Sequence, residues 1–171
     1  MVSRFFIILL FFPLALSSCG YHRAETAANL PDWMENIYVE PFTNNSNEYL
    51  LGPWLTGELR EEFLRDSHFT LSSREEADVI LHGNIESVYT TGLSFLSYDQ
   101  AVERKITVVC SVAITDAKTG KTVWETADIR KEEGFYVGRE VMVTEGLKNE
   151  ALKKISLNLA EIIHHRVAGV F

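Results

Sequence analysis

The histidines of this sequence are the residues that most directly suggest acid–base or metal chemistry, and their spacing favours neither. His164 and His165 are adjacent on a predicted helix, so their side chains point about 100° apart and would clamp a metal ion poorly. His82 stands beside Gly83 in a predicted strand. We interpret the histidine pair as a polar helix end, and His82 as a strand residue rather than a general base.

Carboxylates and sequence motifs give no stronger candidate for catalysis. Glu75, Glu76 and Asp78 cluster in a turn that leads into a strand, and we interpret them as a solvated turn rather than a metal or acid–base site. The chain has no Gly-x-Ser-x-Gly elbow, His-Glu-x-x-His, Cys-x-x-Cys, Walker loop or dinucleotide fingerprint. We therefore predict no enzyme, no metal and no cofactor; a hydrolase that these motifs miss is the alternative, which activity screening would reveal.

Cys19 is the residue with the clearest predicted chemistry. Arg4 precedes an apolar run over residues 5–16, which is typical of a secretory signal, and Leu16-Ser17-Ser18-Cys19-Gly20 follows. This site resembles the lipobox of bacterial lipoproteins, in which the cysteine thiol is joined to a diacylglyceryl group. Each buried methylene contributes about 0.8 kcal/mol, so several acyl chains at one residue make a stable anchor. The alternative is an ordinary signal peptide with a chance cysteine.

The sequence thus divides into a lipoprotein signal peptide over residues 1–18, a lipidated N-terminus and tether over 19–34, and a single domain over 35–171. In enteric lipoproteins an aspartate directly after the cysteine retains the protein at the inner membrane, whereas this sequence has Gly20. That resemblance predicts a lipid-anchored protein of the outer membrane of a Gram-negative bacterium. The tether spans at most about 45 Å when extended, which keeps the domain near its membrane.

Composition fits one globular domain and excludes two function classes. The chain has 171 residues, of which 46% are hydrophobic and 23% charged. Its formal net charge of −8 argues against nucleic-acid binding through bulk electrostatics. No stretch reaches the roughly 20 apolar residues that a membrane-spanning helix needs. With Cys19 lipidated, Cys110 is predicted to be a free, buried thiol.

Hydrophobic spacing predicts four strands and two helices. Strand patterns cover residues 37–42, 77–86, 106–115 and 122–130, and helical spacing covers about 51–66 and 144–168. This order predicts an α+β, two-layer sandwich with two helices packed on one face of a four-stranded mixed sheet, whose first two strands are parallel. We expect a bulge at Gly83 and another in strand 122–130, where neither alternation is cleanly apolar and the register stays open.

Four motifs follow one another along the chain: Cys19-Gly20-Tyr21-His22, Ile37-Tyr38-Val39-x-x-Phe42-x-Asn44, Ala77-Asp78-x-x-Leu81-x-Gly83 and Thr119-Gly120-x-x-x-Trp124-Glu125. In this order they resemble the LptE family of lipopolysaccharide-assembly lipoproteins (RlpB-like) over nearly the whole chain. The resemblance implies a two-helix, four-stranded sandwich that complexes with and plugs the LptD β-barrel, helps it assemble, and aids insertion of lipopolysaccharide into the outer leaflet.

A second resemblance leaves a different function open. The Ala77-Asp78-x-x-Leu81-x-Gly83 motif also occurs in related periplasmic lipoproteins, among them activators of penicillin-binding proteins. Such a protein would be an outer-membrane lipoprotein that regulates a peptidoglycan synthase. It would need a long, flexible tether to cross the periplasm. The short tether of this sequence therefore favours the interpretation as an LptD partner.

Residues 90–99 are the predicted contact segment. They form a connection that is too long for a tight hairpin and unusually apolar for an exposed one, with Leu93, Phe95, Leu96 and Tyr98 as candidate contacts for a barrel wall or acyl chains. The alternative is that the segment folds back onto the core. In the LptE family, lipid-contacting basic residues lie around this loop; here the loop has no Lys or Arg.

Five basic residues are candidates for binding the phosphates of lipid A. Symmetric pairing of the hairpin around Lys118 places Lys105 near Lys131 and Arg104 near Arg130, with Arg139 following close to the family's second basic position. Because the whole chain is acidic, such binding would depend on a local patch. Alternatively, Glu103, Glu132 and Glu133 turn this cluster into a solvated face with cross-strand ion pairs that contribute little.

Overall fold

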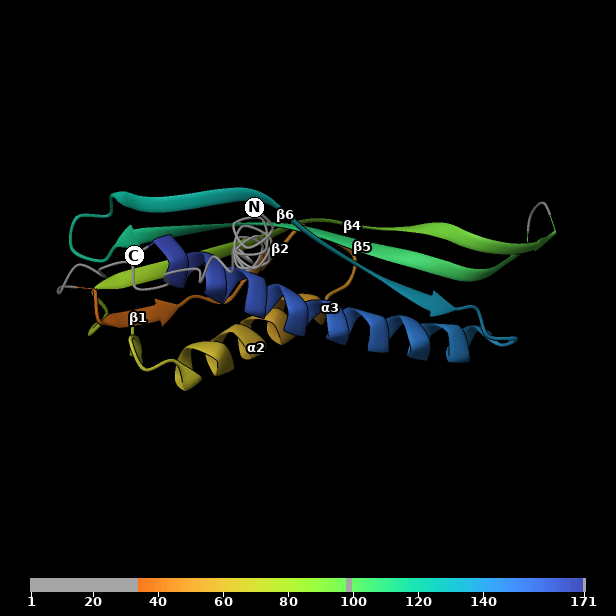
Figure 1. Cartoon of the computed structure of the whole chain (residues 1–171), viewed down its shortest axis with the longest axis horizontal. Coiled ribbons are helices and arrows are strands. Elements are labelled where there is room, and N and C mark those ends of the chain that lie inside the picture. Colours follow the sequence, from red (N-terminus) through yellow and green to blue (C-terminus); the bar gives the residue numbers. More distant parts are fainter. Residues whose placement is uncertain (1–33, 98–99, 171) are drawn as a thin grey trace, which may run out of the picture.

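The computed structural model describes residues 34–97 and 100–170, so the predicted signal peptide and nearly all of the tether lie outside the described residues. The elements are β1 (Asn36–Val39), β2 (Thr43–Asn44), α2 (Leu51–Arg65), β3 (Thr70–Leu71), β4 (Val79–Ser97), β5 (Gln100–Asp116), β6 (Thr122–Tyr136) and α3 (Val141–Val170). Both helices lie on the same face of one mixed sheet (Figure 1). The predicted α+β class is confirmed. Within the described residues, no helix is both long enough and apolar enough to cross a membrane.

The sheet has six strands rather than the predicted four. Their order is β3-β1-β4-β5-β6, with β2 added beside β4. The extra strands β2 and β3 have two residues each, and their backbones pair in parallel with β4 and β1. Two residues are too few to show an alternation, so the sequence pattern could not reveal them. The predicted parallel pairing of the first two predicted strands is confirmed, because Ile37 of β1 pairs in parallel with Val79 of β4.

Helix α2 forms where its leucine spacing predicts it. Leu51, Leu55, Leu59 and Phe63 are all fully buried, and they recur every fourth residue along the face that packs on the sheet. The helix ends at Arg65, close to the predicted end at Asp66. These four side chains therefore anchor the helix layer.

Helix α3 begins at Val141, earlier than the predicted start at Thr144. Its buried stripe begins only at Ala151, and Val141 and Met142 are 79% and 84% exposed. The first turns of α3 bury few side chains against the rest of the protein. Their sequence therefore lacks the apolar spacing by which a helix is predicted. The Gly138 N–H donates a hydrogen bond of 3.0 Å to Thr144 Oγ1, which holds the connection to β6 against the start of this helix.

Gly83 does not mark a bulge, contrary to the expectation from the sequence. It pairs regularly with Val112 of β5. The reason for glycine here is the ring of Phe42, because a Cβ at position 83 would lie 2.2 Å from two of its carbon atoms. The register shift of β4 comes instead between Ile85 and Ser87. Gly83 therefore serves close packing of an aromatic ring on the sheet.

The C-terminal ends of the two helices are joined through Asp66. Its Oδ2 lies 2.7 Å from His164 Nε2, and its Oδ1 accepts a hydrogen bond of 2.6 Å from the His68 N–H. Burial alone would raise the pKa of Asp66, but the hydrogen bonds from the His68 backbone and side chain and from His164 outweigh it and hold the pKa below its ordinary value. His164 thus forms part of a structural clamp, beyond the polar helix end that we predicted.

This clamp predicts a pH dependence of stability. An aspartate whose pKa is lowered in the folded state stabilises the fold above the unfolded pKa of about 3.9 and loses that contribution as the pH falls through the lower folded value. The stability difference between the wild type and Asp66→Asn should therefore be largest at neutral pH and shrink under acid conditions. Urea unfolding of both proteins at stepwise lower pH measures it, with Asp128→Asn as a surface control. A constant difference at all pH values would refute the clamp.

Cys110 is buried in the core and forms no disulfide with any described residue, in agreement with the prediction of a free thiol. Burial, with a smaller contribution from the charge of Glu86, raises the pKa of its thiol to about 12. The thiol is therefore protonated at neutral pH and chemically inert.

Candidate functional site

Strands β4, β5 and β6 continue past β1 and β2 as a three-stranded arm, which we define as residues 86–97, 100–109 and 130–136. The last contact of β4 with β2 is at Ile85. In Figure 1 the tip of the β4–β5 pair extends beyond both the end of β6 and the start of α3. The predicted long connection over residues 90–99 is therefore wrong as far as Ser97, because it is mostly strand; Tyr98 and Asp99 lie outside the described residues.

Bulges explain why the sequence did not reveal the arm. The register of β4 against β5 shifts between Ile85 and Ser87 and again between Gly92 and Ser94. Each extra residue exchanges the two faces of the strand, so a single alternating pattern cannot continue through it. The apolar residues after Gly92 consequently resembled a loop.

The predicted pairing of the basic residues is also wrong. Lys131 opposes Val108 and Arg130 opposes Val109, whereas Lys105 opposes Gly134. The cause is the bulge predicted for β6, which the structure confirms. Asp128 has a φ of 56°, and the register shifts there and again beside Thr115. These shifts displace the basic residues of β6 toward the hairpin turn.

The basic residues consequently divide between the two faces of the sheet. Ile106 and Val108 are fully buried beneath the helices, so Arg104 and Lys131, which share their side, lie on the helix side. The sequence neighbours Lys105 and Arg130 therefore lie on the open face. The four residues do not form one patch.

The two open-face basic residues are engaged by carboxylates. Lys105 Nζ lies 3.0 Å from Glu132 Oε2, and Arg130 Nη2 lies 2.8 Å from Asp128 Oδ1. The charge and hydrogen bond of Asp128 raise the pKa of Arg130. Both pairs are largely exposed and therefore contribute little to stability. Lys105 and Arg130 therefore belong to an ordinary solvated face, as in the alternative interpretation of the sequence.

Three of the predicted basic residues differ from these. In the part of the chain that the structure describes, Arg104, Lys131 and Arg139 have no carboxylate within 4.0 Å. Arg104 and Arg139 are exposed and Lys131 is half-buried. Arg139 lies in the connection between β6 and α3, at the same end of the molecule as the arm. These cations are available to an anionic ligand.

The predicted apolar contacts lie on β4. Leu93 occupies the second bulge and is 52% exposed, and its Cδ2 lies 3.9 Å from the position that a Cβ on Gly134 would occupy. Phe95 and Leu96 belong to β4 near its end, but their side chains fall outside the described part of the chain, as does Tyr98. At least Leu93 is thus presented at the surface of the arm.

Exposed apolar residues that the sequence reasoning missed lie at the same end. Tyr136, Val141 and Met142 are 68%, 79% and 84% exposed. Tyr136 is the last residue of β6, within the arm, and Val141 and Met142 are the first two residues of α3. The sequence contained a signal, because Val141, Met142 and Val143 are three consecutive apolar residues, and an exposed run of this kind at the start of a helix is unusual without a partner.

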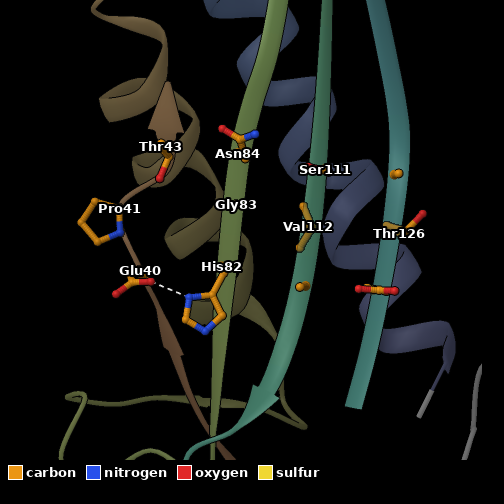
Figure 2. A pocket seen from close by; sticks show the side chains of 12 residues that line it. Glu40, Pro41, Thr43, His82, Gly83, Asn84, Ser111, Val112 and Thr126 are labelled. Atoms are coloured by element: carbon orange, nitrogen blue, oxygen red, sulfur yellow. Dashed lines mark hydrogen bonds and ion pairs between the residues drawn. The ribbon is translucent and has the colours of Figure 1, made fainter. Parts of the chain in front are cut away.

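The open face also carries a hollow of about 580 Å³ over the centre of the sheet. Figure 2 shows Glu40 and His82 at one side of it, with Asn84 farther along β4 and Ser111 and Thr126 on the neighbouring strands β5 and β6. Small side chains on β5 and β6, including Ala113 and Ala127, form its floor. The hollow is shallow because the open face has no helix layer.

His82 is fully engaged within this hollow. Its Nδ1 lies 2.5 Å from Glu40 Oε2 and its Nε2 lies 2.9 Å from Thr115 Oγ1. Burial would raise the pKa of Glu40, but hydrogen bonds from His82 and Arg74 outweigh it and lower the pKa. With both ring nitrogens bonded, His82 links β4 to the β1–β2 connection and to β5. This agrees with its interpretation as a strand residue.

The remaining polar candidates also have structural partners. Asp78 accepts hydrogen bonds of 3.0 Å from the backbone N–H and the side-chain amide of Asn36, which ties β4 to β1. Among the described residues, no group of three or more His, Cys, Asp or Glu side chains could hold a metal ion.

Comparison with solved structures finds several lipoproteins of the same fold. Uncharacterized lipoprotein B from Nitrosomonas europaea has a TM-score of 0.60 and 14% identity, over 82% of this chain and 85% of that chain. Rare lipoprotein B from Shewanella oneidensis has a TM-score of 0.54 and 13% identity, over 80% and 96%. A putative lipoprotein from Caulobacter crescentus has a TM-score of 0.54 and 12% identity, over 77% and 87%. At these identities the likeness concerns the fold alone.

Sequence comparison identifies the family. No curated protein matches the chain. The sequence profile described as LptE, Lipopolysaccharide-assembly, matches residues 34–167, which is nearly the whole described domain. Proteins of this family are structural and assembly proteins rather than enzymes. The chain therefore belongs to the LptE family of lipopolysaccharide-assembly proteins.

Proposed function

We propose that this protein is an outer-membrane lipoprotein, anchored through lipid on Cys19, that complexes with and plugs the LptD β-barrel. In this complex it assists assembly of the barrel and insertion of lipopolysaccharide into the outer leaflet. The observation that carries the proposal is the LptE profile match over residues 34–167. The lipobox at the N-terminus supports a membrane anchor.

The dimensions of the fold support a plug. Helix α3 has 30 residues and is about 45 Å long, and β4 has 19 residues and is about 60 Å long. The molecule is elongated in Figure 1, with one helix layer on one sheet. Outer-membrane barrels of about 22 strands enclose a lumen wide enough for a plug. An elongated two-layer domain can occupy such a lumen lengthwise while its arm reaches along the wall.

Contact with lipopolysaccharide would use the cations and apolar side chains at the arm end. Lipid A presents phosphates, for which Arg104 and Arg139 supply exposed guanidinium groups. Leu93 and Met142 supply exposed apolar surface at the same end. Because the formal net charge is −8, the attraction is confined to this patch and is short-ranged.

Charge reversal tests the lipopolysaccharide contact. The double variant Arg104→Glu and Arg139→Glu should weaken lipopolysaccharide binding by the purified protein by about tenfold or more, the effect of losing one charge-assisted hydrogen bond. Circular dichroism should stay unchanged. The matched control reverses the exposed Lys118 and Lys121 at the opposite hairpin turn. If the affinity is unaltered, or falls equally in the control, the patch does not bind lipopolysaccharide.

Removing apolar surface from the arm tests the barrel contact. The double variant Leu93→Ser and Phe95→Ser should reduce the amount of barrel that copurifies with the tagged protein. Leu64→Ser with Leu157→Ser is the matched control, since both leucines are exposed on the helix layer. Quantitative mass spectrometry of the purified complex gives the ratio. An undiminished complex from the arm variant would show that this part of the arm does not dock on the barrel.

A further inference from the structure

The outer edge of β4 in the arm has no partner strand in the described residues. Strand β2 pairs with β4 only at Asn84 and Ile85, and from Ser87 onward β4 bonds to β5 alone. Over residues 87–92 the pairing with β5 is regular, and Tyr89 to Leu93 are all exposed. A regular stretch of this length matches an average strand. It leaves a slot beside β4 that begins where β2 ends.

The backbone groups that line this slot can be assigned from the neighbouring ladder. The Asp116 N–H donates to the Lys121 carbonyl and the Val137 N–H donates to the Val102 carbonyl, so the even-numbered residues of β5 face β6. Thr107 therefore faces β4 and bonds to Tyr89, its partner in the register. Residues on either side of Tyr89 consequently direct their N–H and C=O groups outward. Within the described residues, the backbone donors and acceptors at positions 88, 90 and 92 face the slot and have no partner strand.

The other edge of the arm, along β6, is protected against pairing with another strand. Along β6 the edge carries the charged residues Asp128, Arg130, Lys131, Glu132 and Glu133, and a bulge at Asp128 twists it. Charges and bulges are the means by which proteins prevent an edge strand from pairing with another chain. Residues 87–92 of β4 lie between two bulges of their own strand, pair regularly with β5 and include no charged residue. This edge is not protected by charge.

We propose that residues 87–92 of β4 pair edge-on with an extended strand of the partner barrel before that barrel closes. The proposal rests on the proposed function and adds to it the site and the stage of contact. Pairing by β-addition uses main-chain hydrogen bonds and tolerates many side chains. A closed barrel has no free strand edge, so a barrel strand can occupy the slot only while the barrel is open. The arm thus covers an exposed edge during assembly.

A second copy of the chain does not fit the slot. If β4 of a second copy paired antiparallel along residues 87–92, that strand would continue toward Ile85. There β2 already lies beside β4. Shifting the two copies outward to avoid β2 would leave only the residues after Gly92, where the register is irregular. A separate strand that starts at the end of β2 meets neither obstacle.

Photo-crosslinking from both faces of the strand tests the pairing. A photoreactive phenylalanine analogue is placed at position 88, 89, 90 or 91 of the full-length lipoprotein in living cells. Edge-on pairing predicts that all four positions crosslink to one extended segment of the barrel, and that the trapped barrel migrates in its unfolded, heat-insensitive form. Crosslinks from alternate positions alone would indicate docking on one face of the sheet and would overturn the proposal. So would crosslinks to a second copy or to closed barrel alone.

A proline variant tests the role of the backbone. Thr90→Pro removes an outward N–H while leaving the bonds to β5 intact, because proline is tolerated on a free edge. It should lower the crosslink yield from position 89 by about tenfold, as expected from one hydrogen bond and the added steric block. Glu132→Pro on the outward side of β6 is the matched control and should leave the yield unchanged. Equal yields from Thr90→Pro and wild type, with unchanged thermal unfolding, would overturn the proposal.

These outcomes are separate from a failure of the proposed function. If the mature barrel copurifies with the wild-type protein while positions 88–91 give no crosslink, the complex stands and the edge pairing is wrong. If no barrel copurifies at all, the proposed function itself fails.

Discussion

Replacing Phe63 with alanine is expected to lower the free energy of unfolding by about 4 kcal/mol. Phe63 is fully buried on the inward face of α2. Its ring packs edge-on against Phe69 at 5.3 Å and against His164 at 5.0 Å, so it joins α2 to β3 and to α3. Truncation leaves a cavity at the junction of three elements, and the surrounding backbone cannot collapse into it without moving a helix.

Urea denaturation followed by circular dichroism measures this effect. Leu64→Ala is the matched control, because Leu64 is the next residue of the same helix and is 60% exposed. Its replacement should change the free energy of unfolding by less than about 0.5 kcal/mol. If Phe63→Ala destabilised the protein no more than Leu64→Ala, the helix layer would not pack on the sheet as the structure describes.

Replacing Cys19 with serine is expected to abolish lipid labelling and to move to the soluble fraction whatever part of the protein is not bound to a membrane barrel. The predicted anchor carries several acyl chains, each contributing about 0.8 kcal/mol per buried methylene, so its loss removes nearly all membrane affinity of the unbound protein. No described helix can substitute for it. Fractionation of cells that express the wild type and Cys19→Ser measures the change directly, and labelled palmitate reports the lipid.

Cys110 provides the control for this experiment. Its thiol is buried and its pKa is raised to about 12, so it should take up no lipid. The Cys110→Ala variant should therefore remain membrane-bound and keep its palmitate label. Retention of label and membrane attachment by Cys19→Ser would show that the lipobox interpretation is wrong.

The elements that bury a regular apolar face could be predicted from the sequence. Leucines at every fourth residue define α2, and the alternation from Ile106 to Ile114 defines the centre of β5. In both cases the periodicity of the side chains matches the periodicity of the backbone, because the same face meets the core throughout. The family motifs added the order of the elements and the functional class.

The arm and its register could not be predicted in this way. Bulges near Glu86 and Asp128 exchange the two faces of their strands, and nothing local in the sequence fixes where they fall. The residues beyond them are paired but exposed, so burial leaves no pattern at Thr90 or Tyr136. The predicted cross-strand pairing of the basic residues was wrong for the same reason, because Lys131 opposes Val108 and Lys105 opposes Gly134.

The central claim is that this LptE-family chain acts in a complex with an outer-membrane barrel. Gentle detergent extraction of native membranes, capture through a C-terminal tag and mass spectrometry of the bound proteins test it most directly. We expect a large outer-membrane β-barrel to be recovered in near-equal amount. Recovery of a penicillin-binding protein without any barrel would contradict it, and would assign this fold to regulation of a peptidoglycan synthase instead.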